Sequence, residues 1–108
     1  MDDDIHSMNF PAFIIESGSL TFIDVNNARI KQYGYSKEEF LTMKVFALRP
    51  YAEQEEVRQI ATLFEHENFY AGTSHHCTKN VEQLKVRIIA ERTNFKEMNV
   101  WLIKEKIL

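Results

Sequence analysis

The spacing of apolar residues predicts a β-hairpin near the start of the chain. Two runs rich in β-branched and aromatic residues, Phe13–Ile15 and Leu20–Ile23, flank a turn-forming stretch at residues 16–19. Such runs suit strands, and the glycine and serines between them suit a tight turn. We therefore expect Phe13–Val25 to form two paired strands.

The second half of the chain has the alternation of a sheet with one buried face. In Glu82–Glu91 nearly every second residue is apolar, and Tyr70–Lys79 before it has the length of a partner strand. We expect these segments to pair and to turn near Asn80. Asn99–Lys106 follows as the last strand and carries apolar residues on both faces. Two apolar faces indicate that something covers the outer side of the sheet at this strand.

Two short helices are expected between the hairpin and these strands. Asn26 or Asn27 can cap the first helix, and Gly34 can take the positive φ angle at which helices often end. Ser36 and Glu39 have the spacing of a capping box, which begins the second helix. The apolar face predicted for the first helix consists of Ala28, Ile30 and Tyr33.

A longer helix is predicted over Glu53–His66. Its apolar residues fall at positions i, i+3, i+4 and i+7, namely Val57, Ile60, Ala61 and Phe64. Glutamates occupy its first turn, where they complement the helix dipole. We expect the apolar stripe to close one side of a pocket against the sheet.

A hairpin, then helices, then three strands is the order of an α+β domain. We predict one five-stranded antiparallel sheet, with the short helices and the longer helix packed across one face. The 108 residues are enough for a single domain, which we place at residues 9–108. Met1–Met8 is polar and contains three consecutive aspartates, so we expect a flexible arm there. The alternative is a helix that packs on the sheet or on a partner through Ile5 and Met8.

Two motifs in this chain resemble the PAS sensory domains. The recurring PAS segment is a strand ending in Val-Asn-x-Ala, a helix, and then Gly-Tyr-Ser-x-Glu-Glu; Val25–Ala28 and Gly34–Glu39 match it. The resemblance extends more loosely from Phe13 to the end of the chain. It implies a PAS-like fold and a sensory role in a bacterial signalling protein, upstream of a histidine-kinase or diguanylate-cyclase output domain. Because PAS domains share a scaffold and differ in what they sense, it identifies no ligand.

The resemblance also offers two cofactor tests, and both disfavour the cofactor. In the flavin-photoreceptor branch a cysteine forms the photoadduct within a segment that corresponds here to Lys44–Arg49. Val45 stands at the position of that cysteine and cannot bond to flavin. In the haem branch a histidine early in the long helix ligates the iron, but Ala52–Glu56 contains no histidine and His66 lies at the far end. The cofactor therefore stays unknown.

Composition limits the partners and the location that we expect for the protein. With a net charge of −3, the sequence gives no indication of the basic patch that nucleic-acid binding requires. No apolar run approaches the ~20 residues of a membrane span, so we expect no direct membrane contact. The single cysteine, Cys77, excludes an internal disulfide and favours a cytoplasmic location.

No catalytic or metal site is predicted. In a strand His75 and Cys77 share one face and His76 points to the other, so the three supply at most two ligands of a tetrahedral zinc site. The adjacent histidine is also badly placed to activate Cys77 as a nucleophile. Three strand cations are interpreted as facing solvent: Lys85, Arg87 and Arg92. We therefore expect this domain to catalyse no reaction by itself.

The function we expect is that of a sensory module that works by population shift. A small ligand or a partner favours one arrangement of helix against sheet, and flanking segments pass that bias to an output domain. The candidate pocket-lining residues are Tyr33, Phe46, Ile60, Phe64, His76 and Leu102.

The alternative is a ligand-free dimerisation module. In that case an exposed apolar residue of the last strand, Trp101 or Val100 depending on register, joins Ile5 and Met8 in a symmetric homodimer interface. The two roles can coexist, and we expect a homodimer in both.

Overall fold

The structure of the protein, a computed structural model, describes residues 4–48 and 54–108, without the side chains of residues 46, 48, 54–57 and 60. The strands are β1 (Ala12–Glu16), β2 (Phe22–Val25), β3 (Phe69–Cys77), β4 (Gln83–Phe95) and β5 (Met98–Ile107). The α-helices are α1 (Asn27–Tyr33), α2 (Lys37–Phe40) and α3 (Gln54–His66). Two 3-10 helices are η1 (Ile5–Ser7) and η2 (Val45–Leu48).

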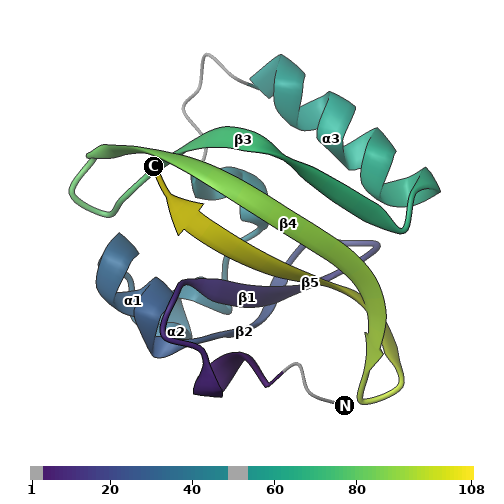
Figure 1. Ribbon diagram of the computed structural model, residues 1–108, viewed down its shortest axis with the longest axis horizontal. Coiled ribbons are helices and arrows are strands. Elements are labelled where there is room, and N and C mark those ends of the chain that lie inside the picture. The colour runs from purple at the N-terminus through teal and green to yellow at the C-terminus, as the bar shows by residue number, and fades with distance from the viewer. Residues whose placement is uncertain (1–3, 49–53) are drawn as a thin grey trace.

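The five strands form one antiparallel sheet in the order β2-β1-β5-β4-β3 (Figure 1). The two predicted hairpins are therefore confirmed, and β5 lies between them in the middle of the sheet. The chain turns between β3 and β4 where the amide of Thr78 donates to the carbonyl of Glu82 at 2.8 Å. The predicted α+β architecture is confirmed.

The predicted helix ends in the first half of the chain are confirmed in detail. Asn26 caps α1 by accepting from the amide of Arg29. Gly34 ends α1 with a φ of 84°, a left-handed angle that costs glycine little because it has no Cβ. Ser36 and Glu39 make both hydrogen bonds of a capping box at the start of α2. The helix predicted over Glu53–His66 is α3, and Glu53 itself lies outside the described residues.

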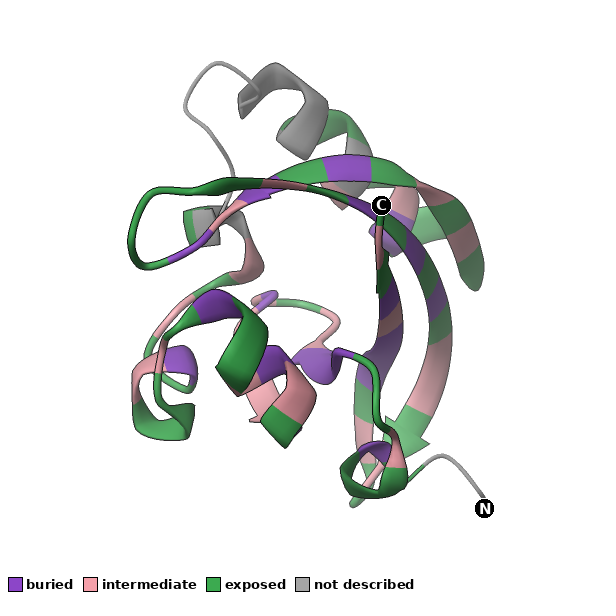
Figure 2. Cartoon of the chain, turned by 60° about the vertical axis from the view of Figure 1, so that its left-hand side comes forward, coloured by how far each residue is buried: buried purple, intermediate pink, exposed green. Residues whose placement is uncertain are grey.

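The main core lies between the helices and one face of the sheet. Tyr33 of α1, Phe40 of α2 and Phe64 of α3 pack with inward-facing strand residues such as Ile103. Figure 2 shows the alternation along the strands as bands of buried and exposed residues. We call this side of the sheet the inner face.

The opposite side, the outer face, is partly covered by the N-terminal segment. Ile5 of η1 is buried and packs against a second cluster that consists of Ala12, Ile14, Val100 and Leu102. Residues 4–8 thus adopt the packed arrangement given above as the alternative to a flexible arm.

The interface expected for the dimerisation module is wrong in its key residues. Val100 and Trp101 both have an exposed fraction of 0% and Ile5 has 2%, so this chain itself already covers them. Trp101 lies on the inner face, where its ring stacks on that of Phe64 with centroids 4.4 Å apart. A symmetric interface built on these side chains is therefore excluded in this conformation.

The described part of the chain contains no helix long and apolar enough to cross a membrane. Nor do residues 4–48 and 54–108 bring together three or more His, Cys, Asp or Glu side chains that could hold a metal ion. His75 and Cys77 face outward and His76 faces inward, as the strand alternation predicted.

Candidate functional site

The most unusual feature of the core is a buried ion pair that joins α1 to β5. Nη1 of Arg29 lies 2.5 Å from Oε1 of Glu105, and both side chains have an exposed fraction of 0%. Taking two charges out of water is costly, so a buried pair persists only where the surroundings compensate both. The contacts around each partner show how this is achieved.

Tyr33 and His76 surround the carboxylate. The Tyr33 hydroxyl donates to Glu105 at 3.2 and 3.3 Å and lies 2.7 Å from Nδ1 of His76. That Nδ1 also lies 3.1 Å from Oε2 of Glu105. Because a carboxylate only accepts hydrogen bonds, Nδ1 has to carry a hydrogen for this contact to be favourable. The network therefore joins α1, β3 and β5.

Aromatic rings surround the guanidinium. The Cζ atom of Arg29 lies 3.9 Å from the ring centroid of Tyr33 and 4.1 Å from that of Phe13. Phe40 and Phe22 follow at 5.4 and 5.5 Å. Cation–π contacts of this kind contribute about 2 kcal/mol when the cation is desolvated. Arg29 thus fills the space between α1 and the sheet with its own side chain.

Two donors of Arg29 have no acceptor. Nη1 has its ionic contact with Glu105, whereas Nε and Nη2, which are also buried, make neither a hydrogen bond nor an ion pair with any described residue. An unmet buried donor costs roughly 1–3 kcal/mol, and a charged one costs more. The N–H groups of these two nitrogens are where an acceptor, whether water or the oxygen of a ligand, would lower the free energy of the folded domain.

The electrostatics favour an ionised Glu105. Burial by itself would raise its pKa, but the positive charge of Arg29 and the hydrogen bond from His76 outweigh burial, and the pKa of Glu105 lies below its usual value. The site therefore holds a carboxylate against a guanidinium.

Three of the six candidate pocket residues lie on the inner face, and two of these three contact each other. Tyr33, Phe64 and His76 are buried on the inner face, and Tyr33 contacts His76 directly. Phe64 packs on Trp101 instead of the charged network. The side chains of Phe46 and Ile60 lie outside the described residues.

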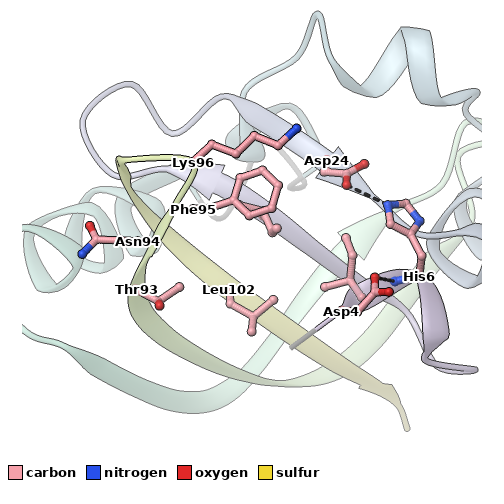
Figure 3. Close-up of a pocket in the computed structure, with 10 residues that line it drawn as sticks. Asp4, His6, Asp24, Thr93, Asn94, Phe95, Lys96 and Leu102 are labelled. Carbon is pink, nitrogen blue, oxygen red and sulfur yellow. Dashed lines mark hydrogen bonds and ion pairs between the residues drawn. The ribbon is translucent and has the colours of Figure 1, made fainter. Parts of the chain in front are cut away.

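Leu102 lies apart from these residues, on the outer face. It lines a groove of about 480 Å³ between the N-terminal segment and the turn that joins β4 to β5. Figure 3 shows this groove, with the imidazole of His6 facing Asp24 at one side and Phe95 and Lys96 at the hairpin. Nε2 of His6 lies 2.7 Å from Oδ2 of Asp24, which ties the N-terminal segment to β2.

Sequence reasoning missed Arg29 and Glu105. The apolar face expected for the first helix was Ala28, Ile30 and Tyr33, but the buried residues of α1 are Arg29 and Tyr33, and Ile30 is half-buried. Spacing four residues apart does place Arg29 above Tyr33 on one face.

A signal for Glu105 was present in the alternation of the last strand. Trp101 and Ile103 face inward, so the next residue of that series, Glu105, has to face inward too.

The interpretation of Arg92 as solvent-facing is wrong. Its guanidinium lies 4.8 Å from the Trp101 ring and donates to the carbonyls of Phe64 and Glu67 at the end of α3. It thus satisfies carbonyls that a helix end leaves without partners. Lys85 and Arg87 are exposed, as expected.

The fold is that of solved PAS domains. A PAS domain of a two-component sensor histidine kinase matches with a TM-score of 0.74 and 17% identity over 96% of this chain and 89% of that one. A PAS domain from Colwellia psychrerythraea matches at 0.82 and 16% over 96% and 90%. A domain of a sensory box sensor histidine kinase/response regulator from Geobacter sulfurreducens matches at 0.77 and 19% over 93% and 85%. No family model and no curated protein matches the sequence.

Proposed function

We propose that this chain, which has the PAS fold, is a sensory module that transmits a conformational bias to an output domain outside it. The observation that carries the proposal is the buried Arg29–Glu105 ion pair, which links the helical side of the domain to the central strand β5. Support for a role in signal transduction also comes from the histidine kinases among the proteins with this fold.

The module works as a two-state element. In one state the pair is closed, with Tyr33 and His76 bound to Glu105. In the other, α1 moves relative to β5 and the pair opens. A minor state populated at about 0.1–10% lies a few kcal/mol above the major one, and an input that binds the minor state better shifts the balance. Opening changes the environment of β5 and hence of whatever follows it.

The input is a small polar ligand or a protein partner. The unmet Nε and Nη2 donors of Arg29 favour a ligand with carbonyl or carboxylate oxygens. We assign the domain no reaction of its own. We place it in the cytoplasm, where the free thiol of Cys77 stays reduced.

Tyr33→Phe tests the two-state mechanism. It removes the hydroxyl that contacts both His76 and Glu105 but keeps the buried ring. NMR relaxation dispersion of the wild-type protein should show exchange in α1, β3 and β5 with one common rate, and the variant should raise the minor population. The matched control is Tyr35→Phe, because Tyr35 is only half-buried and packs on Phe40 through its ring. Exchange that never reaches β5 would contradict the mechanism.

Native mass spectrometry with a visible absorption spectrum tests the ligand and the oligomeric state. An added mass that is lost on denaturation would identify a bound small molecule. Colour would reinstate haem or flavin despite Val45, and a bare polypeptide would leave a protein partner as the input. A dimer mass would show self-association.

A further inference from the structure

Within residues 4–48 and 54–108, the chain covers one half of the outer face of the sheet. η1 covers the half that contains Ile14, Val100 and Leu102. The other half includes β3, the start of β4 and the end of β5, and on β4 and β5 alternation turns a different set of side chains outward. These outward residues are Lys85, Arg87 and Ile89 on β4, and Lys104 and Lys106 on β5.

Like charges stand directly opposite each other on this bare half. Arg87 pairs with Lys106 across the two strands, and Ile89 pairs with Lys104. Like charges in such positions destabilise a sheet. Among the described residues, Lys85, Arg87 and Lys106 make no ion pair that would relieve this. Because these cations repel one another, the cluster suits an anionic partner.

The same area contains an apolar groove of about 500 Å³. Phe10, Pro11, Ile89 and Ile107 line it, next to Arg87 and the two lysines of β5. Phe10 and Ile89 are the large apolar side chains here that stay exposed, at 40% and 42%. The surface therefore offers apolar contact and positive charge within one groove.

We propose that this groove binds an acidic amphipathic segment of a partner protein, with its apolar side chains against Phe10 and Ile89 and its carboxylates on Arg87 and Lys106. Helix-in-groove recognition combines these two features. A symmetric second copy would set the same cations against each other, because a two-fold interface repeats each patch. Nucleic acid phosphates would leave the apolar lining unmatched, and a flat bilayer surface would leave a recessed groove unfilled. This inference is independent of the buried network.

The test is an NMR titration of the protein with a synthetic helical peptide that carries a leucine stripe flanked by glutamates. Two control peptides replace the glutamates by lysines or the leucines by serines. Binding of the first peptide alone, with shifts at Phe10, β4 and β5 that weaken as salt rises, supports the proposal. Binding of either control with equal affinity overturns it, and so does the absence of binding.

Arg87→Glu is the decisive variant. The new carboxylate would face Lys106, so the fold should keep or gain stability while the acidic peptide binds about tenfold more weakly. Lys31→Glu, an exposed lysine on α1, makes the same charge change away from the groove and should leave affinity unchanged. An equal loss of peptide affinity in both variants would show that net charge alone causes the effect, and it would overturn the proposal. The proposal would also be overturned if Arg87→Glu weakened binding to anionic vesicles or duplex DNA as much as binding to the peptide, or if the variant dissociated a homodimer.

Discussion

Replacing Glu105 by glutamine removes one charge from the core and almost none of its shape. Arg29, whose side chain is fully buried 2.5 Å from the carboxylate, would then hold an uncompensated positive charge. Breaking a buried pair in this way costs about 3–5 kcal/mol. The rings of Phe13 and Tyr33 offset none of this loss, because they already contact the guanidinium in the wild-type protein. Domains of this size are stable by only about 5–15 kcal/mol, so the loss is large.

A double-mutant cycle isolates the charge pair from the packing. Arg29→Met removes the cation but leaves Glu105 its contacts with Tyr33 and His76, so it should cost less than Glu105→Gln. The double variant buries no charge at either position. Its free energy of unfolding should therefore fall by clearly less than the sum of the two single losses. Additive losses would refute the idea that the two charges depend on each other.

Urea unfolding, followed by circular dichroism and by the fluorescence of Trp101, measures these differences. Trp101 is the one tryptophan of the chain and is fully buried, so its emission reports the core. With a slope of about 1–3 kcal/mol per molar urea, Glu105→Gln should lower the midpoint by about 2 M. Glu91→Gln, on the exposed side of β4, is the control and should change stability by less than about 0.5 kcal/mol. A loss below about 1 kcal/mol in Glu105→Gln would show that the pair contributes little.

Three further changes test other parts of the structure. Asn26→Ala removes the α1 cap together with side-chain bonds to the N-terminal segment, so thermal unfolding should show a loss of about 2–3 kcal/mol. Gly34→Ala should cost about 1–2 kcal/mol because of its φ of 84°, whereas Gly18→Ala, with open space around it, should be nearly neutral. The pKa of Asp24 is lowered, because contacts with His6 and a neighbouring lysine outweigh the effect of burial. The lowered pKa stabilises the folded state at pH values above the ordinary pKa of 3.8, and this stabilisation is lost as pH falls through the pKa of the folded state. In Asp24→Asn, the free energy of unfolding measured over a pH series should lack this decrease at acid pH.

Much of the fold could be predicted because local signals agreed with one another. Ser36 with Glu39, Gly34 after the first helix and the alternation in β4 are each set by neighbours in the sequence. Such signals do not depend on what the rest of the chain does. The strand order β2-β1-β5-β4-β3 depends on long-range pairing, which periodicity does not encode, and no order was predicted from the sequence.

The site could be predicted only in part, because its two charged members contradict ordinary burial preferences. A helical arginine between Ala28 and Ile30 is normally assigned to solvent, since Arg is almost never fully buried unless paired. Glu105, which pairs with Arg29, lies 76 positions further along the chain, and no local sequence pattern connects the two residues. Leu102, which was predicted to line the pocket, lies on the outer face, because both faces of its strand are apolar and alternation alone cannot tell which face the helices cover.

The position of β5 in the sheet has a consequence for how the protein is made. The last strand of this domain along the chain lies in the middle of the sheet, so the β1–β2 hairpin and the β3–β4 hairpin are not joined into one sheet until β5 has been added. Contacts of such long range slow folding, and edges that wait unpaired favour aggregation. On the ribosome, Arg29 therefore stays solvated and the two hairpins stay separate until Glu105 has been added.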